Sequence, residues 1–599
     1  MEQGPYRAHK VLREDRDDGS ILLRSGWPIG PVADKTTDWL HQWAARTPDT
    51  VFLAERSGAG WREVTYHETL GKVRALAAGL LARGMGADTP ILIISGNGVD
   101  HGLLTLAAQY VGVPTVPVAE QYALIPAANR QLALIAEMIR PAMVYAADGK
   151  RFGAALGLDS FAELERVVSR NAVPDMTSLP DMMGSASARD VDAAAAKVGP
   201  DTVAKILLTS GSTSAPKGVL TTHRMMCSNQ AMIAETLPFL SAHPPRIVDW
   251  LPWNHVFGGN HNFNMMLANG GSLYVDGGKP APGLIDLSIE NLHQVTGTIA
   301  FNVPAGFALL RNAMRDDAKL RQRYFEDLDM LFYAGASLPQ DVWADLEEMA
   351  RQVRGDMPLF TSSWGLTETA PACLIQHEPT TRSGIVGVPM PDVTIKLIPD
   401  DDMRFDVRVK GPVVMPGYFE APEKTTEAFD EEGYFITGDA MKFVDPDDMS
   451  MGLRFDGRIA EDFKLMTGIW VRAANLRLDV LVSLTGLAAD VIVTGEERDQ
   501  IGVMIVPSPA LRARGDVTED AGALLCPSAA AEITAILKAR PVEGSSTRIT
   551  RAMILAEPPS IADGEITAKG NLNFAKLLER RADLLERLYD DGDPATILI

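Results

Sequence analysis

Cysteine is scarce in this chain of 599 residues. The three cysteines, Cys227, Cys373 and Cys526, lie far apart and form no Cys-x-x-Cys pair. Three cysteines cannot pair completely, and no zinc-type spacing is present, so the sequence predicts a reduced, cytoplasmic protein with small core thiols. A chain of this length buries a core that needs no disulfide staples.

Long apolar runs and an excess of positive charge are also lacking. No stretch approaches the roughly 20 apolar residues of a membrane span, and we expect no signal peptide because the start of the chain is charged and lacks an apolar segment. The net charge is −22. Such a surface repels nucleic acid and anionic lipid, so we expect neither as a partner. A nucleotide site would therefore need its own basic side chains and backbone N–H groups.

Short apolar runs alternate with amphipathic stretches along most of the chain. This alternation predicts an α/β fold with parallel-rich sheets in two α/β subdomains. We make a separate prediction for each of three further segments. Residues 172–199 are expected to form a surface connection, 386–456 a smaller β-rich subdomain, and 571–591 one amphipathic helix. The predicted strands are 90–95, 204–210, 246–252 and 329–335, and the predicted helices are 68–84, 101–112, 222–237 and 340–353.

The sharpest motif is LLTSGSTSAPKGVLTTH, residues 207–223. An apolar strand enters a loop of glycine and hydroxyl side chains, and we expect a helix to follow. Converging N–H groups, hydroxyls and one lysine bind phosphate oxygens. No Ser or Thr follows Lys217, so the loop differs from a Walker P-loop and argues against that class of NTPase. The predicted phosphate-binding residues are Thr209, Ser210, Gly211, Ser212, Thr213 and Lys217.

TSGSTSAPKG resembles the phosphate-binding signature of the adenylate-forming superfamily, which includes acyl-CoA synthetases, luciferases and adenylation domains of peptide synthetases. Other motifs that resemble those of the family follow along nearly the whole chain. The resemblance implies an ATP- and Mg²⁺-dependent ligase. Its implied parts are an N-terminal adenylation domain (1–457), a hinge (458–464) and a small mobile C-terminal α/β domain (465–599). The further motifs are LPWNHVFGG (251–259), LFYAGASLP (331–339), WGLTE (364–368), GVPMP (387–391) and YFITGDAMKF (434–443).

The resemblance also implies roles in nucleotide binding. Trp364 would stack on adenine, Thr367 would contact the α-phosphate and Glu368 would hold Mg²⁺, which suits a π face, a hydroxyl and a hard oxygen ligand. Asp439 would accept hydrogen bonds from the ribose hydroxyls, with Arg458 beside it. The remaining residues implied at the adenine site are Gly335, Ala336, Ser337 and Gly365.

The resemblance places the acid and the second half-reaction as well. Lys569 is implied as the lysine that reaches both the carboxylate and the α-phosphate, although the order here is Lys-Gly rather than Gly-Lys. The hinge residue is Glu461 or Asp462, and Gly468 is implied to border the tunnel for coenzyme A (CoA). The implied lining of the acid pocket is His255, which also lies next to the carboxylate, with Phe257, Asn302 and Val303.

The segment GRIAEDFKLMTGIWV and the opening TTDWLHQWAARTPDT resemble the feruloyl-CoA synthetase group of bacterial CoA ligases. This implies a hydroxycinnamate such as ferulate, while another aromatic acid or a medium-chain fatty acid would also fit an apolar cleft. CoA is the expected acceptor, and a carrier protein is the alternative. A non-catalytic nucleotide sensor is a third reading, which the presence of Glu368 and Lys569 disfavours. We expect a monomer or a homodimer.

Overall fold

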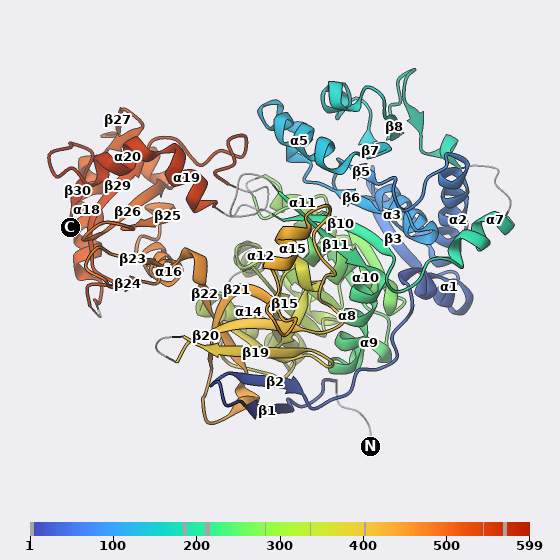
Figure 1. Ribbon diagram of the computed structural model, residues 1–599, viewed down its shortest axis with the longest axis horizontal. Helices are drawn as coiled ribbons and strands as arrows, with labels where there is room; N and C mark the ends of the chain where they lie inside the picture. The colour runs from blue at the N-terminus through green and yellow to red at the C-terminus, as the bar shows by residue number, and fades with distance from the viewer. Residues whose placement is uncertain are drawn as a thin grey trace.

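A large N-terminal body and a smaller C-terminal lobe make up the fold, and they meet near β22 and α16 (Figure 1). The computed structural model describes residues 5–183, 188–209, 216–281, 283–335, 337–400, 403–542, 544–566 and 572–599. The predicted α/β class is confirmed, and its sheets mix parallel and antiparallel pairs. Within those residues, no helix is both long and apolar enough to cross a lipid bilayer.

A seven-stranded sheet carries the strand that enters the glycine-rich loop. Its central strands are parallel and buried on both faces: Ile91 and Ile93 share a core with α2 and α3, whereas Leu92 packs with α5. Apolar runs without alternation are typical of such strands. In sheet order the strands are β11 (Lys217–Thr222), β10 (Val203–Thr209), β6 (Thr115–Pro117), β5 (Ile91–Ile93), β7 (Met143–Asp148), β8 (Glu165–Arg170) and β9 (Thr177–Ser178).

An eleven-stranded sheet runs through the rest of the body. Its parallel part, β14–β15–β16, continues without a break into antiparallel strands, so the predicted β-rich subdomain shares one sheet with its neighbour. In order the strands are β1 (Val11–Asp15), β2 (Ile21–Ser25), β19 (Thr394–Pro399), β20 (Phe405–Lys410), β21 (Phe435–Phe443), β22 (Leu453–Arg458), β18 (Ile385–Pro389), β17 (Ala372–Ile375), β16 (Leu359–Gly365), β15 (Met330–Tyr333) and β14 (Ile299–Asn302).

A four-stranded sheet and the helices complete the body. The four strands are β12 (Arg246–Asp249), β13 (Ser272–Val275), β3 (Val51–Ser57) and β4 (Gly60–Thr65). The longer helices are α1 (Thr36–Arg46), α2 (Tyr66–Ala82), α3 (Val99–Val111), α5 (Asn129–Ile139), α8 (His223–Thr236), α11 (Ile285–Gln294), α12 (Pro304–Asp316), α13 (Ala318–Glu326) and α14 (Gln340–Arg354), and the short ones are α4 (Gln121–Leu124), α6 (Gly153–Leu156), α9 (Phe239–Ala242), α10 (Phe263–Ala268) and α15 (Pro422–Glu427).

The expected strand–loop–helix arrangement of the phosphate motif is wrong. A strand, β11, separates the loop from the helix, and it pairs antiparallel with β10 so that Lys217 lies opposite Thr209. Val219, Thr221 and Thr222 are β-branched, which favours the strand. The helix α8 begins only after Thr222, whose side chain caps it. The loop is therefore the connection of a β-hairpin, and its lysine is the first residue of a strand.

Two smaller expectations also need correction. Residues 172–199 contain a helix, α7 (Ala188–Ala195), whose Val191 is buried in the same core as residues of α2. The amphipathic helix expected over 571–591 is two helices, α19 (Phe574–Arg580) and α20 (Ala582–Leu588), divided at Arg581. The Arg581 guanidinium bonds Glu565 at 2.7 Å and two backbone carbonyls, which holds it against the preceding segment.

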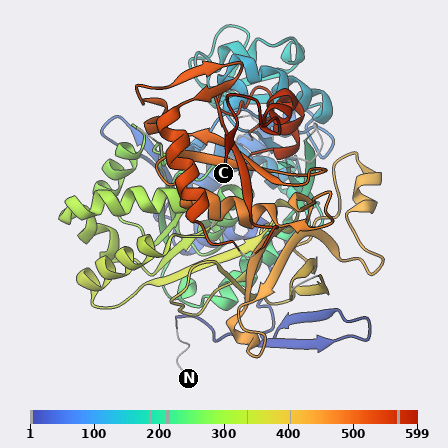
Figure 2. The ribbon, with the colours of Figure 1, turned by 90° about the vertical axis from the view of Figure 1, so that its left-hand side faces the viewer.

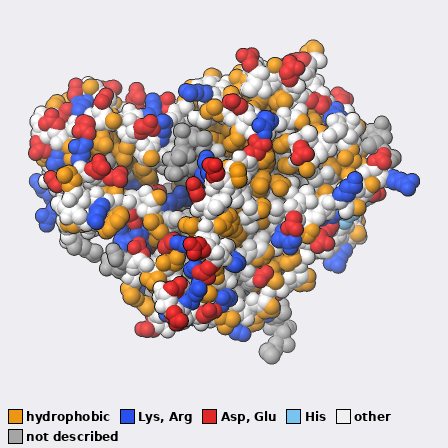
Figure 3. All heavy atoms as spheres, viewed as in Figure 1, with side chains coloured by type: hydrophobic (Ala, Val, Ile, Leu, Met, Phe, Trp, Pro, Cys, Tyr) orange, Lys and Arg blue, Asp and Glu red, His pale blue; other side chains and the backbone are white. Residues whose placement is uncertain are grey.

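The C-terminal lobe has its own hydrophobic core. Two buried clusters are built entirely from residues 463–599, and they pack both faces of one sheet. Figure 2 shows this lobe, in red, in front of the body. On the face in Figure 3, acidic and basic side chains are interspersed over both parts. The lobe comprises β23 (Phe463–Lys464), β24 (Trp470–Val471), α16 (Ala473–Ser483), β25 (Ala488–Thr494), β26 (Ile501–Pro507), α17 (Pro509–Arg512), β27 (Thr518–Asp520), β28 (Ala523–Leu525), α18 (Pro527–Ala539), β29 (Ile549–Leu555), α19, α20 and β30 (Ile597–Leu598).

Candidate active site

The ends of the glycine-rich loop are fixed by the β10–β11 ladder. Thr209 and Lys217 are cross-strand partners, so the chain leaves and re-enters the sheet at one place. At Gly218 a Cβ atom would lie 2.8 Å from Ile206 Cγ2, and the Gly218 carbonyl accepts a bond of 2.7 Å from Phe419 N. The glycine thus lets this strand approach its neighbours closely. The predicted Ser210, Gly211, Ser212 and Thr213 lie outside the described residues.

At the start of β11, Lys217 lies beside Tyr418, which in turn contacts Glu368. The Lys217 Nζ is 4.9 Å from the centre of the Tyr418 ring, and the Tyr418 hydroxyl donates a bond of 3.1 Å to Glu368 Oε1. Burial and the neighbouring Glu368 raise the pKa of Tyr418, so its hydroxyl keeps its proton. The predicted cation and the predicted metal ligand are therefore neighbours. Tyr418 was missed from the sequence, where it follows a Pro-Gly turn without a recognisable pattern.

The WGLTE motif ends strand β16 and enters a short 3-10 turn, Thr367–Thr369. Thr367 and Glu368 are buried. A Cβ atom at Gly365 would lie 1.6 Å from the Pro371 carbonyl oxygen, so only glycine lets the strand turn here. The turn orients the Glu368 side chain toward Tyr418.

Trp364, Asp439 and Arg458 form a second group. The Trp364 Nε1 donates a bond of 2.9 Å to Asp439 Oδ2, and Arg458 Nε lies 3.5 Å from Asp439 Oδ1. Asp439 and Arg458 are also cross-strand partners in β21 and β22. Within the part of the chain that the structure describes, Asp439 Oδ1 accepts no hydrogen bond although it is buried. Burial raises the pKa of Asp439 to about 6, against the opposing effects of Arg458 and Trp364.

A loop after β15 carries two of the residues predicted at the adenine site. Gly335 has a φ of +88°, which favours glycine, and Ser337 is exposed close to Gly384. Ala336 lies outside the described residues.

The segment predicted to line the acid pocket contains a π-helical turn, Phe257–Asn262. Such turns are uncommon and occur often at functional sites. His255 accepts a bond of 3.3 Å from Phe257 N through its Nδ1. The Phe257 ring packs on Phe301, with centres 5.8 Å apart, next in sequence to the predicted Asn302 and Val303. The two predicted parts of the pocket wall are thus brought together.

A buried lysine that the sequence analysis missed holds this turn. Lys205 lies on β10, and its Nζ donates bonds of 2.6 Å to the Gly259 carbonyl and 3.1 Å to Asn260 Oδ1. Burial lowers the pKa of Lys205 to about 7. The only sequence signal is a lysine inside the apolar run AKILL. The strand that enters the glycine-rich loop is thereby bonded to the wall of the predicted acid pocket.

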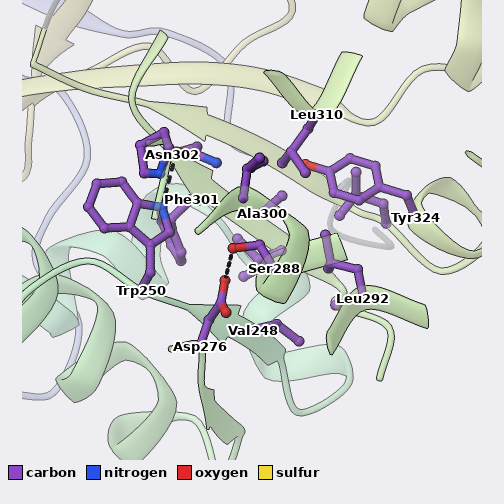
Figure 4. A pocket seen from close by; sticks show the side chains of 15 residues that line it. Val248, Trp250, Asp276, Ser288, Leu292, Ala300, Phe301, Asn302, Leu310 and Tyr324 are labelled. Carbon is purple, nitrogen blue, oxygen red and sulfur yellow. Dashed lines mark hydrogen bonds between the residues drawn. The ribbon is translucent and has the colours of Figure 1, made fainter. Parts of the chain in front are cut away.

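A cavity lies behind Asn302, between β14 and α11 (Figure 4). Asn302 Oδ1 accepts bonds of 3.2 Å from Trp250 Nε1 and 2.9 Å from Val303 N. These bonds fix the side chains of Asn302 and Trp250. Asp276, which also lines the cavity, accepts bonds from Ser288 Oγ at 2.5 Å, from Gly278 N and from Asn291 Nδ2. The apolar lining includes Ile285, Leu292, Ile299, Ala300, Phe301, Leu310, Tyr324 and Leu328.

The junction between the two parts of the molecule contains a buried ionic cluster. Arg404 is only 2% exposed; it bonds Asp462 through Nη1, and its Nε lies 3.4 Å from Asp456. Asn475 of α16 donates to Asp456 at 3.2 Å. Glu461, the other predicted hinge residue, ends a 3-10 turn beside it.

Two of the predicted residues, Gly468 and Lys569, belong to the C-terminal lobe. Gly468 lies in the β23–β24 hairpin, exposed, with a φ of +88° and open space around it. Lys569 lies outside the described residues, and so does its neighbour Gly570.

Metal binding would have to rely on few protein ligands. Among the described residues there is no cluster of three or more His, Cys, Asp or Glu side chains arranged for a metal ion. Mg²⁺ is usually bound by one or two carboxylates together with substrate phosphates and water. Glu368 is buried, and its Oε1 accepts a bond from Tyr418, so a single carboxylate of this kind fits that pattern.

Comparison with known proteins agrees with this architecture. Residues 40–419 match the AMP-binding enzyme family and residues 466–593 match the AMP-binding enzyme C-terminal domain, so the chain belongs to the AMP-binding, adenylate-forming family. It is 29% identical to a long-chain-fatty-acid–CoA ligase of Salmonella typhimurium over 366 residues, which are 58% of this chain and 60% of that ligase.

Two further similarities extend over more of the chain. A CoA ligase of Mycobacterium tuberculosis that acts on a methyl-dioxo-octahydroindenyl propanoate is 26% identical over 77% of this chain and 86% of its own length. ATP-bound MatB from Rhodopseudomonas palustris has the same fold, with a TM-score of 0.68 and 21% identity over 92% of this chain and 99% of MatB.

Proposed function

We propose that this protein is an AMP-forming acid–CoA ligase that activates a carboxylic acid with ATP and transfers the acyl group to CoA. Two groups of residues from the predicted motifs carry the proposal. Trp364, Asp439 and Arg458 offer an aromatic face and a carboxylate oxygen that is ion-paired with Arg458 but accepts no hydrogen bond from the described residues. Lys217 and Glu368 offer a cation and a metal ligand, linked by Tyr418.

The buried Oδ1 atom of Asp439 indicates that a nucleoside would fit this site. A buried carboxylate oxygen without a donor is costly, and a ribose hydroxyl would supply the missing hydrogen bond. Arg458 lies on the same side of the carboxylate and keeps it charged. Trp364 fixes the other oxygen, so the free oxygen is held in one orientation.

In the first step, a carboxylate oxygen of the acid attacks the α-phosphorus of ATP. A P–O bond to the acid forms, the bond to the β-phosphate oxygen breaks, and pyrophosphate leaves with the electron pair. Lys217 and the loop N–H groups would bind the leaving phosphates, and Thr367 would contact the α-phosphate. Lys569 would lie between the two anions and stabilise the transition state. Mg²⁺ bound at Glu368 would neutralise charge on the triphosphate.

In the second step, the CoA sulfur attacks the acyl carbon and AMP leaves, while the thiol proton passes to solvent. We propose that the C-terminal domain, 465–599, reorients between the steps about the hinge 458–464. The Arg404 contact favours Asp462 over Glu461 as the hinge residue, because Asp462 bonds across the junction. Gly468 would then border the CoA tunnel, where a side chain would narrow the path.

A hydroxycinnamate such as ferulate is our proposed substrate. Aromatic rings of Phe257 and Phe301 form the wall beside His255, which suits a planar acid. Another aromatic acid or a medium-chain fatty acid is the alternative, and so is transfer to a carrier protein. We further propose that the enzyme acts in the cytoplasm, as a monomer or homodimer.

The test is an AMP-release screen with hydroxycinnamates, benzoates and fatty acids as acids, and CoA or a phosphopantetheinyl carrier protein as acceptor. We expect acid-dependent AMP release that requires CoA and is fastest with a hydroxycinnamate. Release with the carrier protein alone would overturn the CoA assignment. ATP binding without AMP release for any acid would overturn the ligase assignment.

A further inference from the structure

His261 is a buried imidazole enclosed by phenyl rings. It lies in the π-helical turn with no exposed surface, and its ring centre is 5.6 Å from that of Phe257, 5.5 Å from Phe301 and 5.0 Å from Phe332. Of these rings, Phe257 was predicted to line the acid pocket, and Phe301 lines the cavity of Figure 4. A polar side chain in such a place calls for a reason other than packing.

When the buried Asp249 is ionised, the hydrogen-bond network fixes which nitrogen of His261 carries the proton; burial raises the pKa of Asp249 to about 7. Asn262 Nδ2 donates a bond of 2.9 Å to Asp249 Oδ2, so the Asn262 Oδ1 is directed to His261 Nδ1 at 2.9 Å. That oxygen only accepts, hence Nδ1 must donate and Nε2 is the bare acceptor. Burial lowers the pKa of His261 to about 4, so the ring is neutral at pH 7.

The Nε2 atom therefore has an unused lone pair. It is fully buried, and none of the described residues donates a hydrogen bond to it. Leaving a buried acceptor unpaired opposes folding, whereas a phenylalanine here would have no such cost. Asp249 and Asn262 nevertheless hold the imidazole in the tautomer that presents this lone pair. The arrangement is suited to a donor that comes with the ligand.

We propose that His261 Nε2 accepts a hydrogen bond from the ring hydroxyl of a phenolic acid, and that His261 is a specificity-determining residue. The inference rests on the proposed function. A hydroxyl at the ring position remote from the carboxylate provides one O–H donor on a flat apolar body, which matches one acceptor among aromatic rings. Phe257 has the largest exposed fraction of the three phenyl rings, 8%, and its rotation would open the path.

The same chemistry separates phenols from close analogues. A 4-methoxy group or a fatty acyl chain has no donor, and each would leave Nε2 unpaired in the bound state. Sites built around a buried hydrogen-bonding group reject an analogue that lacks the partner far more strongly than apolar pockets reject a change of size. We expect about a ten- to hundredfold preference in kcat/KM for 4-hydroxycinnamate over cinnamate and over 4-methoxycinnamate.

The experiment measures AMP release with these three acids for the wild type and for His261→Phe and His261→Gln. In His261→Phe the preference should fall to within about threefold, with cinnamate turnover retained and the KM for ATP unchanged. His261→Gln keeps an acceptor oxygen and should keep part of the preference. A wild type that uses the three acids equally, or a His261→Phe variant that keeps the full preference, would overturn the inference.

Two results keep this test apart from the test of the ligase function. If the wild type releases no AMP with any acid, the proposed function fails. If it turns over acids but shows no phenol preference, only the role of His261 fails. Because the wild-type comparison needs no substitution, it stands even if a variant does not fold.

Discussion

The indole nitrogen of Trp364 donates a hydrogen bond of 2.9 Å to the carboxylate of Asp439, although the two residues are 75 positions apart. One motif is thus bonded directly to another. The second carboxylate oxygen is buried; it lies 3.5 Å from Arg458 Nε and accepts no hydrogen bond from the described residues. In this account Trp364 has two tasks: it offers a ring to adenine, and it orients the acceptor for ribose.

Trp364→Phe separates these two tasks, because it keeps an aromatic ring and removes the N–H donor. We expect a five- to tenfold rise in the KM for ATP and a smaller change in kcat. A hydrogen bond to a charged group contributes about 1.5–3 kcal/mol, and a bond from water would replace part of this free energy in the variant. The measurement is ATP dependence of AMP release. Trp343→Phe is the matched control, since Trp343 is buried in another cluster. An unchanged KM in Trp364→Phe would contradict the role of the N–H group.

The Asp439 carboxyl predicts a dependence on pH. Its pKa of about 6 means that it loses its charge as the pH falls through that value, so the KM for ATP should rise between pH 7 and pH 5. In Asp439→Asn the KM should be high and flat over the same range. A wild-type KM that stays constant to pH 5 would rule out Asp439 as the titrating ligand of ribose.

The raised pKa of Asp439 also predicts how the stability of the protein depends on pH. Burial raises the folded-state pKa of Asp439 above its unfolded value, so ionised Asp439 opposes folding at neutral pH, and this opposition disappears as the pH falls toward 4. Without nucleotide, Asp439→Asn should therefore increase the free energy of unfolding at pH 8, on the order of 1–3 kcal/mol, and have little effect at pH 4. Denaturant titrations at the two pH values measure this difference.

Tyr418→Phe tests the link between the cation and the metal ligand. The variant keeps the ring beside Lys217 and removes the hydroxyl that bonds Glu368. Without this bond the Glu368 carboxylate is oriented less well. The Mg²⁺ concentration for half-maximal rate should therefore rise several-fold, as is usual when a group that positions a metal ligand is lost. Tyr324→Phe, in another buried cluster, is the control. Equal Mg²⁺ dependence in both variants would exclude this role.

The Arg404–Asp462 contact predicts which residue governs the second step. Asp462→Asn weakens a bond across the junction, whereas Glu461→Gln leaves it intact. We expect Asp462→Asn to change the rate of thioester formation at least threefold more than the rate of adenylation, with Glu461→Gln close to wild type. Single-turnover measurements of each half-reaction decide this. The reverse pattern would place the hinge at Glu461.

Much of the architecture follows from local patterns. The strands at 90–95 and 329–335 and the helices at 68–84 and 340–353 are where the apolar periodicity predicts them, because each buries a face that its own segment specifies. The continuous eleven-stranded sheet was not predicted, since pairing between strands distant in sequence has no local signal. The strand β11 was missed because it is short and its last residue, Thr222, is also the cap of the helix α8.

In the candidate active site, too, only some of the features could be predicted from the sequence. Motif residues such as Asp439 and Glu368 could be named from the sequence, but their contacts with Trp364 and Tyr418 could not. Lys205 and His261 carry no motif, and their roles depend on burial and on a π-helical turn that no periodicity reveals. Such residues can be identified only from the folded structure, because it alone shows that a polar group is buried away from water.

The most direct test of the central claim is acid-dependent exchange of labelled pyrophosphate into ATP. We expect the wild type to catalyse this exchange without CoA. Lys569→Ala should lose it by about 10²–10³-fold while ATP affinity stays within a few-fold, as is typical when one transition-state contact is removed. Lys576→Ala is the matched control, because Lys576 is paired with Glu579 at 2.9 Å. Exchange at the wild-type rate in Lys569→Ala, or no acid-dependent exchange in the wild type, would contradict the account.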